Sequence, residues 1–392
     1  MTTGKIPTHD ELFDGGPPRR LETALRLITP EKPKRIRCAL LVALIGWAPL
    51  ILLAALQSLA LGQDRVSAVL FDFAVHARYL VAVPLLIAAE SVALPKLGST
   101  VRHFVTANLI RESDRPRFEA IVASTGRLLN SKVAEFLVVI LAYAAIFILI
   151  RTIPSRIIPD WYLLTNENLS FTWAGWWHTL VSMALALTIL FGWLWRLFLW
   201  GLVLWRVSRL DLYLVPAHPD LSGGLQFVGA SLRAFLLISF AFGAAFAGGV
   251  ANRVVHQGMS LFDFKYAIAA LVVVVLVLFV APLTFFVREI LQARRRGIFE
   301  YGALAGAVGY QMERRWLEPG EKLNEGALEV QHFSATTDLY QMVSNVYHVK
   351  GVPLDLQDLI AVVIALLLPF LPILLFEMPL NVILPDLMKL LL

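Results

Sequence analysis

The residues best suited to chemistry occupy a short polar loop between two long apolar runs. The loop reads Val215-Pro216-Ala217-His218-Pro219-Asp220-Leu221-Ser222-Gly223-Gly224-Leu225. A histidine two positions from a carboxylate can serve as an acid/base pair, which makes His218 and Asp220 the candidate catalytic residues. The two glycines allow backbone amides to approach a ligand closely. The start of the following helix can also bind an anion through its free N–H groups.

Two other interpretations of this loop compete with catalysis. In the first, the loop holds a phosphate, a carboxylate or a lipid headgroup, and nearby arginines supply positive charge. The candidate residues for such an anion or lipid site are His218, Asp220, Ser222, Gly223, Gly224, Arg206 and Arg233. In the second, Pro216 and Pro219 hold an extended backbone and Asp220 or Ser222 caps the following helix.

Polar residues inside the long apolar runs form a second group of candidates, because ionisable groups at membrane depth are costly and often functional. The run 68–94 contains Asp72, His76, Tyr79 and Glu90. Their spacings are close to whole helical turns, so they share one helix face. This stripe either lines a water-filled path or places its first residues at one membrane interface and Glu90 at the other.

Arg196 lies deep in the run 177–205. If the hydrocarbon ends near this residue, its side chain extends to the lipid headgroups. If the residue lies inside the bundle, it needs a carboxylate partner, and Glu90 and Glu135 have suitable depths.

The run 230–251 is rich in small residues, which let helix backbones approach closely. Ala244, Gly248, Asn252 and His256 recur at four-residue spacing, which predicts tight packing with the two polar residues at the outer mouth. The candidates for a polar path are therefore Asp72, His76, Tyr79, Glu90, Glu135, Arg196, Asn252 and His256.

Several kinds of site are disfavoured by the sequence. Cys38 is the one cysteine, which excludes internal disulfides and cysteine metal sites. No zinc, phosphate-loop or nucleophile pattern of an enzyme is present, so no metal or cofactor is predicted and an enzyme is less favoured. The net charge of +5 comes from basic residues spread over several loops. That spread argues against nucleic-acid binding.

The elements that must position these residues are transmembrane helices. Hydrophobic residues make up 58% of the chain, against about 45–50% in soluble domains. They gather in runs long enough to cross roughly 30 Å of hydrocarbon. We predict an all-α transmembrane bundle with seven spans at 38–61, 68–94, 133–151, 177–205, 230–251, 266–290 and 357–376. Pro369 and Pro372 allow six to eight spans, because the last run can be a broken or re-entrant helix.

Lysine and arginine predict the orientation, since they concentrate on the cytoplasmic side of a membrane protein. The N-terminal segment and the loops 96–132, 206–224 and 288–356 hold 25 of them, and the opposite loops with the C-terminal tail hold 6. We therefore expect a cytoplasmic N-terminus. Aromatic residues mark the interfaces, and the outer belt is expected to contain Trp161, Trp173, Trp176 and Trp177.

The predicted organisation has four parts. They are a cytoplasmic segment 1–37, a membrane core 38–293 with a cytoplasmic loop 96–132, a cytoplasmic helical region 294–355, and a membrane helix with tail 356–392. Residues 1–20 are expected to be mobile.

The cytoplasmic segments are themselves predicted to be helical. Residues 97–130 read as amphipathic helices with a break near Ser113-Asp114-Arg115, and the sixth span continues as helix over 289–317. This extension carries an apolar stripe of Ile298, Tyr301, Ala305, Val308, Met312 and Trp316. A second helix is predicted from Thr336 to Tyr347. These helices either pack on each other or present residues 294–350 to a protein partner or a second copy of the chain.

The stretch His218-Pro219-Asp220-Leu221-Ser222-Gly223-Gly224-Leu225 resembles the loop of a group of uncharacterised bacterial multi-pass inner-membrane proteins. Two further segments are similar to that group: Arg294-Arg295-Arg296-Gly297-Ile298-Phe299-Glu300-Tyr301-Gly302-Ala303-Leu304-Ala305, and Val352-Pro353-Leu354-Asp355-Leu356 with the later Leu368-Pro369. The resemblance covers roughly residues 210–380. It implies a bacterial cytoplasmic membrane and no particular activity.

Three functions follow from these patterns. A channel or transporter for an ion or small solute, in one chain or a homo-oligomer, is motivated by the polar residues in the spans. A membrane-embedded enzyme or a lipid- or anion-binding protein is motivated by the His-Pro-Asp loop. A scaffold or sensor is motivated by the cytoplasmic helices. We rank transport first and expect membrane lipids as partners.

Overall fold

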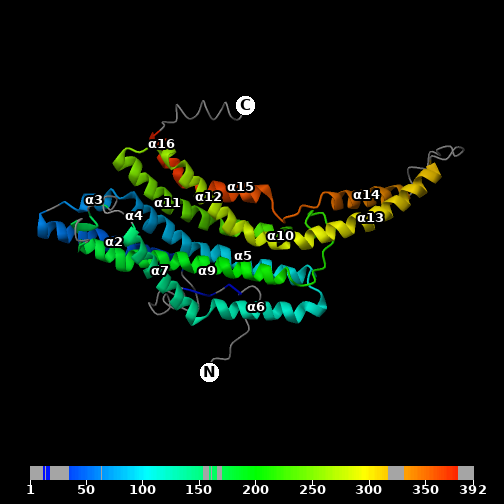
Figure 1. Cartoon of the computed structure of the whole chain (residues 1–392), viewed down its shortest axis with the longest axis horizontal. Helices are drawn as coiled ribbons and strands as arrows, with labels where there is room; N and C mark the ends of the chain where they lie inside the picture. The colour runs from blue at the N-terminus through cyan, green and yellow to red at the C-terminus, as the bar shows by residue number, and fades with distance from the viewer. Residues whose placement is uncertain are drawn as a thin grey trace, which may run out of the picture.

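The computed structural model describes residues 12–13, 15–17, 35–62, 64–152, 159, 161–165, 170–316 and 331–377. Within these ranges, seven helices are long and apolar enough to cross a membrane. They run side by side along the long axis of the molecule (Figure 1). The predicted all-α bundle of seven spans is confirmed.

The first three spans come from the first 152 residues. The first is α2 (Arg35–Leu61). After the short helix α3 (Val66–Leu70), the second span joins α4 (Phe73–His76), the π-helical turn η2 (Ala77–Ala82) and α5 (Val83–Thr106). A 3-10 turn, η3 (Glu112–Asp114), and α6 (Arg115–Leu129) precede the third span, α7 (Lys132–Thr152).

The fourth and fifth spans flank the His-Pro-Asp loop. A small antiparallel hairpin, β1 (Leu163–Thr165) and β2 (Ser170–Phe171), leads into α8 (Trp173–Trp177), the π-helical turn η5 (His178–Ser182) and α9 (Met183–Val207). The fifth span joins α10 (Gln226–Gly229), the 3-10 turn η6 (Ala230–Phe235) and α11 (Leu236–Gln257).

The sixth and seventh spans complete the bundle. The sixth consists of η7 (Leu261–Phe264), α12 (Lys265–Val280), η8 (Ala281–Phe286) and α13 (Val287–Trp316). After α14 (Gln331–Tyr347), the seventh joins α15 (Leu356–Leu367), η10 (Leu368–Phe370) and α16 (Leu371–Glu377). The last run is therefore one continuous helix of 22 residues that contains a 3-10 turn at Pro369, and it is long enough to cross a membrane.

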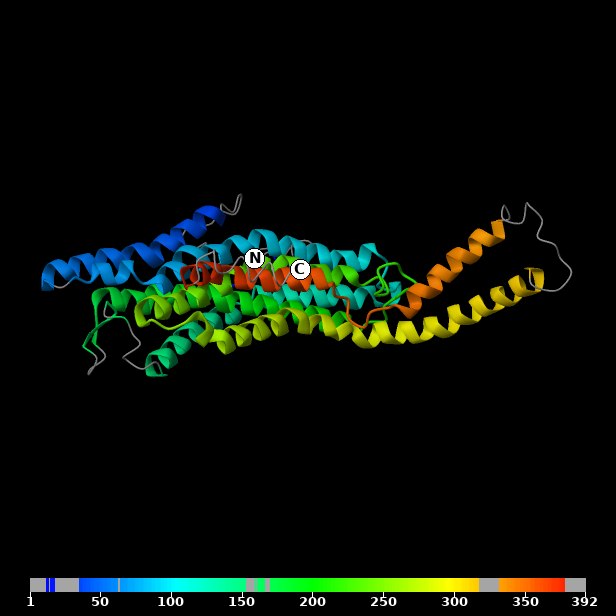
Figure 2. The ribbon, with the colours of Figure 1, turned by 90° about the horizontal axis from the view of Figure 1, so that it is seen from above.

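Four helices are much longer than a bilayer requires. The second, fourth, fifth and sixth have 34, 35, 32 and 54 residues, whereas about 20 residues cross the hydrocarbon. The second and sixth helices extend furthest at the end that carries loops 96–132, 206–224 and 288–356, which we call the basic end. Figure 2 shows α13 and α14 projecting beyond the other helices there.

The projecting helices pack on each other as an antiparallel pair. Arg294 donates a hydrogen bond to the Tyr347 carbonyl at 2.8 Å, and a Cβ at Gly297 would lie 2.9 Å from Val346 Cγ1. On the predicted stripe, Ala305 is buried, and four others are half-buried: Ile298, Tyr301, Val308 and Met312. The second helix begins at residue 331, five residues before its predicted start.

Small residues set the closest helix crossings, as the composition of the fifth span predicts. A Cβ at Gly248 would lie 2.5 Å from Ala77 Cβ, and one at Gly243 would collide with the Leu366 carbonyl. Helix α11 is therefore held between η2 and α15 with backbones nearly in contact. This arrangement fixes which of its residues face the second span.

The expected mobility of residues 1–20 is wrong for residues 12, 13 and 15–17. Leu12 and Phe13 are buried, and the Phe13 ring meets Trp200 edge-to-face at 5.9 Å between centroids. Two apolar side chains near the N-terminus thus belong to the core. The polar residues around them in the sequence gave no indication of this burial.

Candidate functional site

The polar residues predicted in the second and fifth spans meet at the end of the bundle opposite the basic end. The Asp72 carboxylate accepts hydrogen bonds from the Val75 amide (3.1 Å), the Trp161 indole (2.9 Å) and the Asn252 side chain (2.8 Å). The Asn252 oxygen accepts from the Phe73 amide at 2.7 Å. Asp72 therefore ties α4, α11 and the segment before β1 together.

Trp161 was expected in an interfacial belt, but it is 2% exposed and belongs to this buried cluster. Trp173 and Trp176 are half-exposed, as an interfacial position requires. The indole N–H of Trp161 keeps a hydrogen-bond acceptor in this buried position, because it donates to Asp72.

His76 makes structural contacts with both of its ring nitrogens. The Trp47 indole donates to Nδ1 at 2.8 Å, and Nε2 lies 2.8 Å from the Leu70 carbonyl. The neutral tautomer with a proton on Nε2 satisfies both partners. His76 thus links the first and second spans.

Beside Asp72 lies a cavity of about 480 Å³, which we call the chamber. Its polar and aromatic lining consists of Asp72, Arg78, Trp161, Tyr162, His178, Asn252, Arg253, His256 and Gln257. Its apolar lining includes Val75, Leu149, Ile150 and Met183. The chamber therefore combines an apolar wall with a few convergent polar groups, which is typical of small-molecule sites.

Two π-helical turns place side chains against the chamber. Turn η2 carries Arg78 and Tyr79, and turn η5 carries His178. Such turns insert an extra residue into a helix and are frequent at functional sites. Our sequence candidates omitted Arg78 and His178, although both are ionisable residues near apolar runs. The criterion that identified Asp72, an ionisable residue at membrane depth, also applies to Arg78 and His178.

His178 is the unusual group of the chamber. It is 7% exposed, and neither ring nitrogen has a hydrogen-bond partner among the described residues. The rings of Trp161, Tyr162 and Tyr79 surround it edge-to-face at 5.4, 5.1 and 5.8 Å between centroids. Buried polar groups in native proteins are normally paired. A ligand or water in the chamber would supply the missing partner.

The neighbouring hydroxyl groups differ in their pairing. Tyr162 shares a 2.7 Å hydrogen bond with Thr179, and burial raises the pKa of Tyr162. Tyr162 is therefore a neutral hydroxyl near neutral pH. The buried Tyr79 hydroxyl lies beside the Arg78 guanidinium.

Positive charge exceeds negative charge in the chamber. Arg78 lies 5.9 Å from the Tyr79 ring centroid and Arg253 5.8 Å from that of Phe264. In the described part of the chain, neither arginine has a carboxylate oxygen within 4.0 Å. Asp72 is already engaged by three donors. The chamber can therefore accept an anion.

A second polar site lies deeper in the bundle. Arg196 pairs with Glu90 at 3.0 Å and donates to the Gly15 carbonyl at 3.1 Å. Its side chain is 2% exposed, so it lies inside the bundle. Glu135 lies in the first turn of α7 and is half-buried. Of the two predicted carboxylates, Glu90 is the one paired with Arg196.

An apolar layer separates this ion pair from the chamber. Val83, Leu86 and Ile87 are buried between the levels of Arg78 and Glu90, which differ by about 18 Å along a helix. The predicted polar residues thus form two groups in this conformation. Asp72, Asn252 and His256 line the chamber, and Glu90 and Arg196 form the inner pair.

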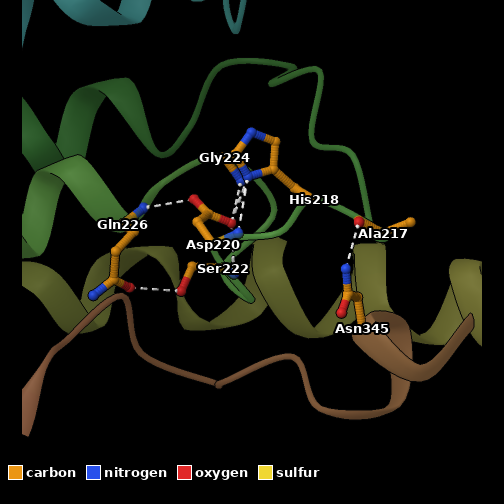
Figure 3. A network of polar contacts seen from close by, with 7 residues as sticks. All are labelled: Ala217, His218, Asp220, Ser222, Gly224, Gln226 and Asn345. Carbon is orange, nitrogen blue, oxygen red and sulfur yellow. Dashed lines mark hydrogen bonds and ion pairs between the residues drawn. The ribbon is translucent and has the colours of Figure 1, made fainter. Parts of the chain in front are cut away.

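The His-Pro-Asp loop is organised around its own aspartate (Figure 3). Asp220 accepts hydrogen bonds from the amides of Ser222 (2.9 Å), Gly224 (3.1 Å) and Gln226 (3.1 Å). Gly223 and Gly224 have φ angles of +69° and +98°, which glycine adopts readily. The amides expected to face an external anion therefore face Asp220.

The charge state of Asp220 follows from these contacts. Burial acts to raise its pKa, but the three amides and the His218 side chain outweigh burial and hold the pKa below its usual value. His218 Nδ1 lies 2.8 Å from Asp220 Oδ1. The two candidate catalytic side chains are thus in contact with each other. The buried Ser222 hydroxyl, however, donates to Gln226 at 3.0 Å and is not an exposed nucleophile.

The loop also joins the bundle to the α13–α14 pair. The carbonyls of Leu214, Ala217 and Leu221 accept hydrogen bonds from Arg296 (3.0 Å), Asn345 (3.4 Å) and Lys350 (2.7 Å) respectively. These three donors come from α13, α14 and the segment after α14. The loop is therefore a structural junction.

The two arginines predicted to assist this loop have other partners. Arg206 donates to the Ser124 hydroxyl at 2.9 Å, and Arg233 forms an ion pair with Asp358 at 2.5 Å.

No family model, no curated protein and no solved structure matches this chain.

Proposed function

We propose that this chain is a membrane transport protein that admits a small anionic solute into the chamber. The observation that carries the proposal is the buried, unpaired His178 imidazole beside Arg78 in a cavity of about 480 Å³. We further propose a bacterial cytoplasmic membrane with the basic end facing the cytoplasm, on the lysine and arginine asymmetry. The solute then enters from the opposite side.

The chemistry of the lining supports an anion with an apolar part. Arg78 and Arg253 supply charge, His178 and Asn252 supply hydrogen-bonding groups, and Leu149 with its neighbours supplies the apolar wall. Arginine in a site of reduced water content attracts anions more strongly than at an open surface. A small organic carboxylate fits these groups.

The apolar layer beneath the chamber supports a carrier rather than an open pore. Val83, Leu86 and Ile87 are buried there, and a carrier would expose this layer to the solute by a conformational change. The π-helical turns η2 and η5 border this layer and can return to α-helical geometry with a shift of one residue. The Glu90–Arg196 pair is then the next polar group along the path. A homo-oligomer remains a prediction.

Flux into proteoliposomes tests the proposal. Chloride, inorganic phosphate and octanoate serve as probes with the full chain reconstituted in neutral lipid. We expect flux of at least one probe. Arg78→Gln should reduce that flux about tenfold or more, because a hydrogen bond to a charged group contributes about 1.5–3 kcal/mol.

Arg151→Gln is the matched control, because Arg151 is an exposed arginine near the same end of the bundle and does not line the chamber. It should leave flux unchanged. The proposal fails if every probe crosses no faster than through protein-free liposomes, or if both variants behave as the parent chain does.

A second candidate function rests on the α13–α14 pair. Phe299 and Tyr310 are 78% and 72% exposed on a helix that extends past the bundle, where water rather than lipid surrounds them if the spans lie in the membrane. Such residues are frequent in protein interfaces. Cellular crosslinking from position 306 tests this scaffold function. Loss of the crosslinked species in Phe299→Asp supports it, and an unchanged pattern opposes it.

A further inference from the structure

A second cavity, of about 410 Å³, lies at the basic end and is independent of the chamber. Its floor is the segment from Ser208 to Leu214, and one wall is the first turns of α13. Four arginines from three parts of the chain line it: Arg111, Arg209, Arg288 and Arg296. We call it the arginine pocket.

The depth of the arginine pocket coincides with the end of two apolar helices. The fourth span ends at Val207, one residue before the pocket floor begins. The apolar part of the sixth span ends at Phe286, and Arg288 already lines the pocket. A membrane around these helices therefore has its phosphate layer at the level of the pocket.

The charges of the pocket are unbalanced. Arg111 is paired with Asp211 at 3.0 Å. Arg296 donates to the Leu214 carbonyl at 3.0 Å and lies 3.8 Å from Glu300. In contrast, no carboxylate oxygen of the described residues lies within 4.0 Å of Arg209 or Arg288.

The lining also holds two carboxylates. Asp211 is engaged by Arg111, and Glu289 is half-buried, with one carboxylate oxygen that has no hydrogen-bond partner among the described residues. Positive charge still exceeds negative charge in the lining, with four arginines against two carboxylates. Arg209 stacks near the Trp205 ring at 5.6 Å, which orients its guanidinium and contributes no negative charge. Two guanidinium groups without a paired carboxylate thus converge on one cavity at the membrane surface.

We propose that the arginine pocket binds a phosphate monoester. Planar guanidinium groups bind phosphate oxygens in pairs of hydrogen bonds. A monoester carries about −1.5 to −2 charges at neutral pH and three acceptor oxygens, so two arginines attract it more strongly than a phosphodiester, which carries one negative charge. The group belongs either to a phospholipid with a terminal phosphate or to a soluble phosphorylated molecule.

Ligand-dependent thermal unfolding of the full chain in neutral detergent tests this site, since a ligand that binds the folded state raises the unfolding temperature. The probes are dioctanoyl phosphatidic acid, dioctanoyl phosphatidylglycerol, glycerol 3-phosphate and inorganic phosphate. We expect the phosphatidic acid to bind about tenfold or more tightly than the diester lipid, which corresponds to about 1.4 kcal/mol.

The soluble probes distinguish the two sources of phosphate. Stabilisation by glycerol 3-phosphate supports a soluble ligand, and stabilisation by phosphatidic acid alone supports a lipid. In Arg209→Gln/Arg288→Gln, the apparent Kd of the active probe should rise about tenfold or more. Arg115→Gln should leave it unchanged, because Arg115 is exposed, is paired with Glu112 and lies outside the pocket.

Three results would overturn the site: equal binding of the monoester and diester lipids, unchanged binding in the double variant, or no stabilisation by any probe. If the double variant does not fold, Arg209→Gln is measured alone. The comparison of monoester with diester lipid on the unaltered chain needs no variant.

Discussion

At the scale of single residues, Asp220 occupies the anion position that the loop sequence predicts. Its carboxylate accepts three backbone amides and contacts His218. A fixed internal anion at a glycine-rich turn stabilises one loop conformation, because the amides would otherwise be buried without acceptors. The loop in turn holds α13 and α14 through its carbonyls.

We predict that Asp220→Ala lowers the free energy of unfolding by about 1–3 kcal/mol at neutral pH, because it leaves buried amides unpaired. The pKa of Asp220 is depressed in the folded chain, so its contribution is present above its usual pKa of about 3.9. That contribution is lost as pH falls through the folded-state pKa. The apparent Tm difference between the two chains should therefore shrink at low pH.

Apparent Tm in detergent, measured from pH 7 to pH 3, checks this prediction. Glu112→Ala is the control, since Glu112 is 86% exposed and pairs with Arg115 at the surface. A Tm difference that is the same at pH 7 and pH 3 would contradict the role of the ionised carboxylate.

At the scale of elements, the crossing of α11 over η2 determines the chamber. Gly248 allows the two backbones to approach, and Asn252 one turn later then reaches Asp72. The chamber lies beside this contact. Any side chain at position 248 would push the helices apart and disturb the lining.

We predict that Gly248→Ala destabilises the chain by about 1–3 kcal/mol, which is typical of overpacking a tight contact. A Cβ there would lie 2.5 Å from Ala77 Cβ. Gly249→Ala is the matched control, because a Cβ at Gly249 has no atom within 4 Å. Apparent Tm of both variants measures the effect. Equal Tm values for the two would show that the crossing tolerates a wider spacing.

At the scale of the whole molecule, two polar cavities lie at opposite ends of the bundle, and the buried Glu90–Arg196 pair lies between them. The chamber and the arginine pocket are lined by different parts of the chain, and positive charge exceeds negative charge in both. The α13–α14 pair extends only the basic end (Figure 2). The two ends of the bundle therefore differ in structure.

We predict that the basic end is cytoplasmic. In a Cys38→Ala background, Lys265→Cys should react with a membrane-impermeant maleimide in intact bacterial cells. Glu112→Cys should react only after permeabilisation. Both positions are exposed and lie at opposite ends of the bundle. The reverse labelling pattern would place the chamber on the cytoplasmic side and contradict the orientation.

The local sequence was sufficient to predict the membrane spans and the helix that continues the sixth span beyond the membrane. The first run was predicted at 38–61 and forms α2 (Arg35–Leu61), and the extension 289–317 corresponds to α13. Hydropathy and helical periodicity act over neighbouring residues, so they can be read without a fold. Asp72, Asn252 and His256 were also identified as candidates in this way.

Only the tertiary structure decided which polar groups meet. It paired Arg196 with Glu90, placed Trp161 on Asp72, buried Phe13, and formed the π-helical turns that carry Arg78 and His178. Each outcome depends on the rotation and depth of one helix against another. The rotation and depth of each helix are set by contacts between residues far apart in the chain, such as the contact of Gly248 with Ala77. The hydropathy of a segment carries no information about such contacts.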